Sequence, residues 1–246
     1  MLNNSNFAII IPARYESSRL PGKVLADIHG FPMIYWTYHR ACLANIGNVL
    51  IAADNELVYK ALEKYKIPFI ETSSNCKNGT ERIAEVSQQL KGIDFFMNVQ
   101  GDEPLLNPQI MRDVFADGLT PNCFKTAVSQ IEDATNSSEV KVAISQENRI
   151  RFASRSPIPY FRDHVQPYFK IHGVYTYCRN TLNTFLAHLP GPLEMAESVE
   201  QLRCIEHDIP LFAVKTSHTE RSVDTVDDLL FVKQKAISHF REWIGN

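Results

Sequence analysis

The chain has 246 residues, of which 44% are hydrophobic and 22% charged, and its formal net charge is -3 at pH 7. This length allows one large α/β domain or two small ones, and the composition is that of an ordinary globular protein. The slightly acidic balance excludes a generally basic surface for nucleic acid or acidic lipid, so a polyanion would have to be bound by a local group of Lys and Arg.

The first half of the sequence alternates between short apolar runs and amphipathic segments. Apolar runs predict buried strands at 7–11, 49–53, 67–70 and 95–99. Helical spacing predicts helices over 33–43 and 57–65, after Gly79, and after Pro108. Such alternation is typical of an α/β fold with a predominantly parallel central sheet and helices on both faces. Ligands of such sheets bind at the carboxyl ends of the strands.

The second half is less regular. It predicts strands at 125–131, 140–144, 169–177 and 211–214, a proline-containing loop at 155–160, a helix around Val199 to Ile205, and a last helix from about Thr225 to Trp243. No repeat or linker divides the chain. We therefore expect a single domain over 1–246, with an inserted subdomain at approximately 145–180.

The cysteines and the apolar runs bear on the cellular compartment. The number of cysteines is odd, five, and none forms a CxxC pair, which is typical of reduced thiols in a cytosolic protein. The histidines form no HxxxH pair that would suggest zinc. No apolar run reaches the length of a membrane span, and the N-terminus lacks the pattern of a signal peptide. The sequence thus predicts a cytoplasmic protein with no membrane partner.

The loop that follows the first strand carries three cations, Arg14, Arg19 and Lys23, within the segment PARYESSRLPGK. Fixed cations stabilise the charge that develops on a leaving pyrophosphate. The segment is neither a Walker A loop nor a GxGxxG turn. A lone Arg here would be an ordinary solvated side chain, but the whole string favours binding of a triphosphate.

Two acidic segments are candidate metal sites. Asp102, in NVQGDEP, directly follows a buried strand, where a carboxylate suits Mg²⁺; a simple strand-to-helix turn explains the same residues equally well. Asp224, in SVDT, fits the start of a helix, since Thr225 and Asp228 have the spacing of a near capping box. Only an association with Asp102 would make Asp224 a second metal ligand.

Three further segments have both a binding and a structural interpretation. NGTER at 78–82 opens a helix where Arg82 could meet an anion or a base edge, or lie at the surface. Arg155, on the proline-stiffened SRSPIPY loop, could bind a carboxylate bidentately. Glu197, Glu200 and Gln201 have the spacing of one helix face, which could bind sugar hydroxyls or be simply solvated.

Together these motifs resemble the CMP-Kdo synthetases (3-deoxy-manno-octulosonate cytidylyltransferases). The resemblance covers nearly the whole chain, and SRSPIPY with ESVEQLR is its most specific part. It implies a Rossmann-like nucleotide-diphospho-sugar transferase fold and a homodimer with the inserted subdomain at its interface. It also implies transfer of CMP from CTP to the anomeric hydroxyl of Kdo, an acidic eight-carbon sugar, by in-line attack on the α-phosphorus with release of pyrophosphate.

The resemblance also implies the roles of single residues. Arg14, Lys23 and Asp102 would be catalytic, and Asp102 and Asp224 would hold Mg²⁺. The nucleotide would be bound by Arg14, Arg19, Lys23, Arg82 and Gln100, and the sugar acid by Arg155, Tyr175, Glu200 and Gln201.

One departure from the family pattern lies at Lys170–Tyr175, where the family usually reads Lys-His-x-Gly-x-Tyr and this chain places His172 one position nearer the glycine. A shift by one residue turns a side chain to the other face of a strand unless a bulge restores it. The 8-amino analogue of Kdo is therefore an alternative substrate. A CMP-sialate synthetase and a non-catalytic nucleotide-sugar binder are further alternatives; SRSPIPY with EQLR argues against the first, and the Asp102–Asp224 pair against the second.

Overall fold

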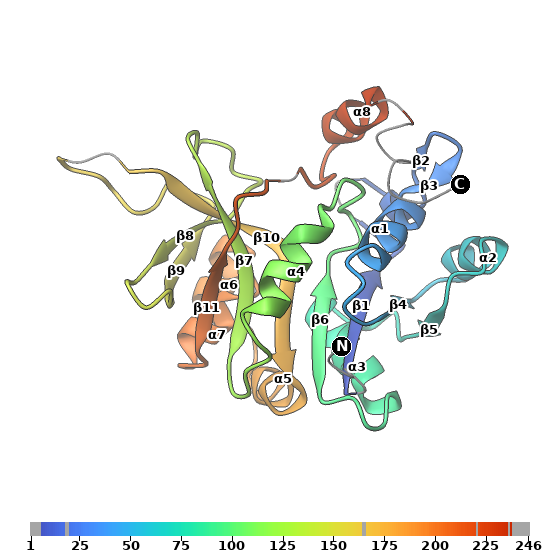
Figure 1. Cartoon of the computed structure of the whole chain (residues 1–246), viewed down its shortest axis with the longest axis horizontal. Coiled ribbons are helices and arrows are strands. Elements are labelled where there is room, and N and C mark those ends of the chain that lie inside the picture. Colours follow the sequence, from blue (N-terminus) through green and yellow to red (C-terminus); the bar gives the residue numbers. More distant parts are fainter. Residues whose placement is uncertain (1–5, 18–19, 164–165, 220, 236, 238–246) are drawn as a thin grey trace. The chain divides into compact units, whose positions relative to one another are not determined.

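The structure is a computed structural model that describes residues 6–17, 20–163, 166–219, 221–235 and 237. The chain divides into two compact units, a first unit of Met1–Arg112 with Glu220–Asn246 and a second unit of Asp113–Thr219. Both units combine strands with helices (Figure 1). Within the described residues, no helix is both long and apolar enough to cross a membrane.

The first unit contains four parallel strands in the order β6-β1-β4-β5. They are β1 (Phe7–Ala13), β4 (Asn48–Ala53), β5 (Phe69–Glu71) and β6 (Phe95–Val99). Every residue of β1 is buried, because this strand lies between two others and has both faces covered. Since parallel strands end at one edge, the loops after β1, β4 and β6 share that edge.

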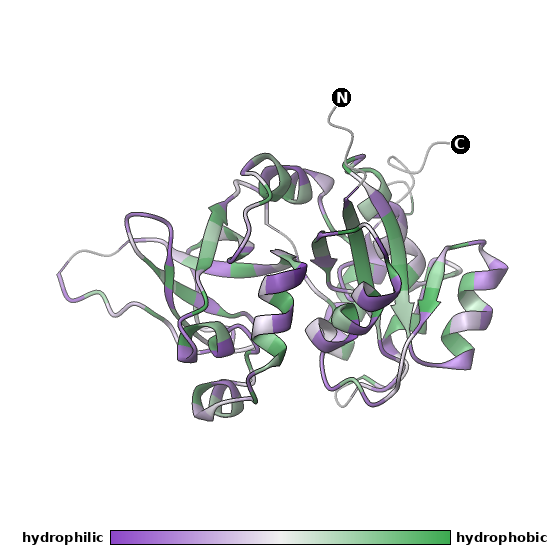
Figure 2. Cartoon of the chain, turned by 90° about the horizontal axis from the view of Figure 1, so that it is seen from below, coloured by the Kyte–Doolittle hydropathy of each residue, from purple (hydrophilic) through white to green (hydrophobic). Residues whose placement is uncertain are grey.

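Among the described residues, three helices of the first unit connect these strands, and a fourth lies near the C-terminus. They are α1 (Met33–Cys42), α2 (Glu56–Lys64), α3 (Gly79–Gln89) and, near the C-terminus, α8 (Val226–Gln234). The strand order reverses between β5 and β6, so right-handed crossovers put α3 on the opposite face from α1 and α2. Figure 2 shows the strands largely hydrophobic and the helices mixed, as amphipathic helices over a sheet should be.

Short elements complete the first unit: a 3-10 helix at Lys23–Leu25, followed by a hairpin of β2 (Asp27–Ile28) and β3 (Phe31–Pro32). The helix α4 (Pro108–Ala116) contains the sequence boundary between the units.

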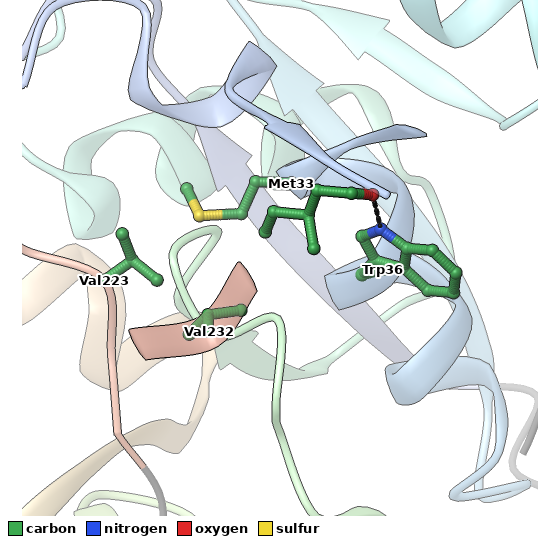
Figure 3. Packing of buried hydrophobic residues seen from close by; sticks show 5 residues of the cluster. Met33, Trp36, Val223 and Val232 are labelled. Carbon is green, nitrogen blue, oxygen red and sulfur yellow. Dashed lines mark hydrogen bonds between the residues drawn. The ribbon is translucent and has the colours of Figure 1, made fainter. Parts of the chain in front are cut away.

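A hydrophobic cluster links the two sequence segments of the first unit. Met33 and Trp36 of α1 pack with Val223 and Val232, and the Trp36 indole donates a hydrogen bond to the carbonyl of Ile28 at 2.9 Å (Figure 3). All five residues are at most 1% exposed. Burial of these side chains therefore anchors the segment around residue 223 to the N-terminal part of the chain.

The second unit is organised around β7 (Phe124–Ile131). This strand pairs in parallel with β11 (Leu211–Lys215) and antiparallel with β10 (Tyr168–Cys178). Antiparallel pairing continues through β8 (Lys141–Ile144) and β9 (Ile150–Ser154). Its helices are α5 (Arg179–Leu186), α6 (Pro192–Glu197) and α7 (Leu202–Glu206).

The expected α/β class and most expected elements are confirmed, but the sequence interpretation was wrong at two helices. The expected last helix is interrupted at Lys235, which is extended; α8 ends at Gln234, Ile237 is again helical, and residues 236 and 238–246 lie outside the described part. The helix expected from Val199 to Ile205 begins only at Leu202, as α7, and the preceding helix α6 ends at left-handed Ser198. Glu197 and Gln201 therefore do not share one helix face. The inserted subdomain at 145–180 stays a prediction.

Candidate active site

The first unit brings Lys23, Asp102 and Asp224 together, which we call the lysine–aspartate cluster. Nζ of Lys23 lies 2.6 Å from Oδ2 of Asp102 and 3.3 Å from Oδ1 of Asp224. The three side chains are 12, 21 and 15% exposed, respectively. Both carboxylates thus converge on a single cation in a mostly desolvated place, although they lie 79 and 201 positions from Lys23 in the sequence.

Close backbone packing positions the members of the cluster. A Cβ on Gly101 would lie 2.7 Å from the carbonyl oxygen of Pro12, so only glycine lets the turn after β6 approach β1 this closely. The backbone N–H of Val223 donates to the carbonyl of Asp102 at 2.9 Å. Because Val223 is also buried in the hydrophobic cluster, Asp224 is held beside Asp102.

The helix-start interpretation of Asp224 is correct as well. Thr225 and Asp228 form a capping box at the start of α8, and the backbone N–H of Asp224 also donates to the Asp228 carboxylate at 3.1 Å. The cap fixes the backbone of Asp224, while its side chain faces Lys23. Helix capping and association with Asp102 therefore occur together.

Electrostatics favour the charged form of the cluster. Burial lowers the pKa of Lys23, but the neighbouring carboxylates of Asp102 and Asp224 outweigh burial and raise that pKa above its ordinary value. Lys23 is thus a permanent cation at neutral pH.

A second charged group lies at the ends of β1 and β4. The guanidinium of Arg82 is fully buried and pairs with Asp54 at 2.7 Å. It also donates to the Thr72 hydroxyl and the Ser73 carbonyl. The other carboxylate oxygen of Asp54 accepts from the backbone N–H of Tyr15 at 3.1 Å. Arg82 therefore braces the loop that contains Arg14, instead of lying at the surface.

For the remaining nucleotide-site candidates, no hydrogen bond or ion pair with the lysine–aspartate cluster is seen among the described residues. Arg14 is exposed, and its Nη1 donates to the carbonyl of Lys77 at 2.8 Å. Gln100 is half-buried in the turn between β6 and Gly101. Arg19 lies outside the described residues.

In the second unit, Arg155 and Glu197 join two loops. The Glu197 carboxylate accepts from the Ser154 hydroxyl at 2.6 Å and from the backbone N–H of Arg155 at 2.9 Å. The Ser154 hydroxyl, helped by that N–H, holds the pKa of Glu197 below its ordinary value. The guanidinium of Arg155 donates to the carbonyls of residues 137, 138, 197 and 198. Every nitrogen of the Arg155 guanidinium thus donates to a backbone carbonyl.

A buried lysine, Lys141, binds the same turn, residues 136–139, to which the Arg155 guanidinium donates. Nζ of Lys141, in a fully buried residue, donates to the carbonyls of Asn136 and Glu139 at 2.8 Å each. Burial lowers the pKa of Lys141. The Glu139 carboxylate in turn pairs with Lys170 at 2.6 Å. The turn at 136–139 is therefore held by contacts with three cations, Lys141, Arg155 and Lys170.

The other sugar-site candidates are also in the second unit. Tyr175 is 8% exposed on β10 and pairs with Thr126. Gln201 is 8% exposed, and its amide donates to the carboxylate of half-buried Glu200 at 3.2 Å.

His172 lies within a register shift between Ile171 and Tyr175, so the regular pairing of β7 and β10 is interrupted at the departure from the family pattern. Its imidazole Nε2 is 2.8 Å from the Ser129 hydroxyl, and the residue is 4% exposed. Burial, with a smaller effect of Lys170, lowers the pKa of His172 to about 3. His172 is thus a packed, neutral residue.

Sequence reasoning missed three of these residues. Asp54 directly follows β4, and its position at the carboxyl edge of the sheet was the available signal. Glu197 was noted only as part of a helix face. Lys141 gave no signal, because its burial depends on the fold of the turn at 136–139. Within the described residues, no three His, Cys, Asp or Glu side chains gather as a metal site.

The chain matches the cytidylyltransferase family over residues 8–212. The 3-deoxy-manno-octulosonate cytidylyltransferase of Lawsonia intracellularis is 37% identical over 232 residues, with 91% of each chain covered. The enzyme of the same name from Vibrio cholerae serotype O1 (strain M66-2) is 39% identical over 245 residues, covering 93% of this chain and 97% of the relative.

Among solved structures, a CMP:2-keto-3-deoxy-manno-octonic acid synthetase in complex with CTP matches with a TM-score of 0.85 and 35% identity, over 93% of this chain and 97% of that one. The inositol-1-phosphate CTP transferase of T. maritima, at 14% identity and a TM-score of 0.69, shares the fold. The expected nucleotidyltransferase fold is therefore confirmed, and the chain belongs to the cytidylyltransferase family, among the 3-deoxy-manno-octulosonate cytidylyltransferases.

Proposed function

We propose that this protein transfers CMP from CTP to the anomeric hydroxyl of Kdo and releases pyrophosphate. The observation that carries the proposal is the lysine–aspartate cluster, in which two carboxylates from distant parts of the sequence meet one cation. A protein that only binds nucleotide-sugars has little need for such a pair. The membership in a family of cytidylyltransferases supports the same reaction.

The donor set fits Mg²⁺. Hard carboxylate oxygens are its preferred protein ligands, and Mg²⁺ usually takes only one or two of them together with phosphate oxygens and water. The position of the Lys23 ammonium, within hydrogen-bonding distance of both carboxylates, supports a cation site here. Asp102 and Asp224 would hold the ion, which when bound would neutralise phosphate charge and acidify the attacking hydroxyl.

The chain's own cations have a separate role. Lys23, charged at neutral pH, and the exposed Arg14 would bind the triphosphate and stabilise the charge on the leaving pyrophosphate. Arg82 is proposed to act by fixing the loop after β1 through Asp54 and the Tyr15 backbone. Arg19 and Gln100 stay candidates for nucleotide binding on the resemblance alone.

Sugar binding is proposed for Arg155, Tyr175, Glu200 and Gln201. The contact between the Glu200 carboxylate and the Gln201 amide keeps one acceptor and one donor side by side, which suits the hydroxyls of a sugar. For Arg155 the support is the resemblance, since its guanidinium already donates to four backbone carbonyls.

A second candidate substrate is the 8-amino analogue of Kdo. It is favoured by His172, whose imidazole on β10 contacts the Ser129 hydroxyl on β7. The family pattern has the histidine one residue earlier. A loss of one imidazole contact would alter the sugar site locally and leave the nucleotide chemistry unchanged.

Pyrophosphate release tests these alternatives. The purified protein is supplied with CTP and Mg²⁺, and with Kdo, 8-amino-Kdo, sialic acid or no sugar. We expect release with Kdo, or with its 8-amino analogue, and none with sialic acid or without sugar. A response to sialic acid alone contradicts the proposed substrate, and no release with any sugar contradicts catalysis.

Homodimeric assembly is a further proposal from the resemblance, and a cytoplasmic location is a further proposal from the cysteine pattern. Light scattering of the purified protein tests the first: the mass of two chains is expected, and the mass of one chain contradicts it. Fractionation of cells that produce the protein tests the second.

A further inference from the structure

Two cysteines face each other across the antiparallel pair of β7 and β10. The register joins Tyr175 to Thr126 and Thr176 to Lys125, and continuing it by two residues brings Cys178 opposite Cys123. The intervening pair agrees with this continuation, because the rings of Phe124 and Tyr177 are 4.7 Å apart.

An independent contact places the Cys178 sulfur at this point. The sulfur lies near enough to the backbone N–H of Asn122, the residue that precedes Cys123, for that N–H to lower the pKa of Cys178. Neither cysteine is in a disulfide, the Cys123 thiol donates to the carbonyl of Thr120 at 3.6 Å, and Cys123 and Cys178 are 3 and 6% exposed. Directly opposed residues of antiparallel strands have Cα atoms about 4.5–5.5 Å apart, a separation that a disulfide can bridge.

The surroundings of the two sulfurs differ. Cys178 caps the N-terminus of α5, where its sulfur lies 3.0 Å from the Thr181 hydroxyl and accepts from the Thr181 N–H. Burial raises the pKa of Cys178, but these contacts and the N–H groups of Asn122 and Asn180 outweigh burial and bring that pKa below its ordinary value. Burial raises the pKa of Cys123. Cys178 is therefore the better thiolate.

We propose that Cys123 and Cys178 form a redox modification site, in which a low-molecular-weight disulfide such as oxidised glutathione converts the two thiols into a cross-strand disulfide. The Cys178 thiolate attacks one sulfur of oxidised glutathione and releases one glutathione thiolate. The Cys123 thiolate then attacks the Cys178 sulfur of the mixed disulfide and releases the second glutathione. The two cysteines lose two electrons and two protons, and one oxidised glutathione becomes two reduced ones.

The test treats the native full-length protein with oxidised glutathione and maps the cysteines by mass spectrometry. We expect one linked peptide pair that contains Cys123 and Cys178 and is about 2 Da lighter than the two reduced peptides together. Exposed Cys42 and partly exposed Cys76 also react with oxidised glutathione, so the linked peptides and not the intact mass are the readout. Cys204, which is fully buried, is the internal control and is expected to stay reduced. The same treatment in urea should lose this selectivity.

Two variants test the order of the steps. Cys123→Ser should stop the reaction at a mixed disulfide of Cys178, with a gain of about 305 Da on the peptide that contains Cys178. Cys178→Ser, which keeps a helix-capping side chain, should leave Cys123 unmodified. The proposal is overturned if both thiols of the native wild-type protein stay reduced, or if either one links to a different cysteine. Neither result depends on whether the protein releases pyrophosphate.

Discussion

The Asp102 carboxylate has one close contact in the lysine–aspartate cluster, with Nζ of Lys23, and both groups are more than three-quarters buried. We expect Asp102→Asn to preserve the shape of the site but to lower kcat by about 10²–10³, because one of the two candidate metal ligands loses its charge. Pyrophosphate release at saturating Mg²⁺ measures this effect. Asp227→Asn, which removes an exposed acid from the first turn of α8, is the matched control and should keep wild-type turnover.

A second expectation at the residue scale concerns acid stability. The folded pKa of His172 is about 3, below the ordinary value of 6.5, so the unfolded chain binds the extra proton between these pH values. The contribution of His172 to folding is complete above pH 6.5 and is lost as the pH falls toward 3. From pH 7 to pH 5, the free energy of unfolding of the wild type should fall by about 2 kcal/mol more than that of His172→Gln, a variant that can keep the hydrogen bond to Ser129. Urea unfolding at the two pH values gives the comparison, and equal losses contradict it.

At the scale of elements, the turn between β6 and Asp102 depends on Gly101. In Gly101→Ala the new Cβ would meet the Pro12 carbonyl at 2.7 Å, so β1 or the turn must move and carry Asp102 away from Lys23. We expect a loss of about 1–3 kcal/mol of stability together with a loss of pyrophosphate release. Gly30→Ala is the control, since its Cβ would meet nothing within 4 Å and only the positive φ is strained. It should cost stability but leave turnover unchanged.

The capping box of α8 is the second element that supports the site. Thr225 accepts from the N–H of Asp228, whose carboxylate accepts from the N–H groups of Asp224 and Thr225. Thr225→Ala should lower the free energy of unfolding by about 1 kcal/mol. It should also weaken Mg²⁺ binding, measured by calorimetry, because the Asp224 backbone is less fixed. An unchanged affinity for Mg²⁺ would show that the helix cap does not support the metal site.

At the scale of the whole molecule, global stability is expected to depend most on buried pairs outside the candidate site. Arg203 and Glu194 share two hydrogen bonds of 2.7 and 2.6 Å, and their side chains are 2 and 10% exposed. Glu194→Gln should destabilise the protein by about 3–5 kcal/mol, because it leaves the buried Arg203 charge uncompensated. The Arg162–Asp163 pair is the contrast, with side chains 87 and 74% exposed at 3.9 Å. Arg162→Ala should change the unfolding free energy by no more than about 0.5 kcal/mol, and similar losses for both variants contradict this assignment.

The sequence by itself determined the order of strands and helices in the first half, because the apolar spacing of a buried parallel strand and of an amphipathic helix is a local property. It also determined the family, through motifs that each lie within a few residues. The breaks at Lys235 and Ser198 were not predicted, since a single extended or left-handed residue interrupts a helix whose apolar pattern continues.

Only the tertiary structure decided which of these motifs share a site. The sequence left Asp224 equally explained as a helix cap, and it gave Arg82 a possible place at the surface. Long-range contacts settled both: the Val223–Asp102 hydrogen bond brings Asp224 to Lys23, and the Asp54 carboxylate takes up the buried Arg82 guanidinium. Contacts between residues this far apart depend on the packing of whole elements, which spacing along the chain does not encode.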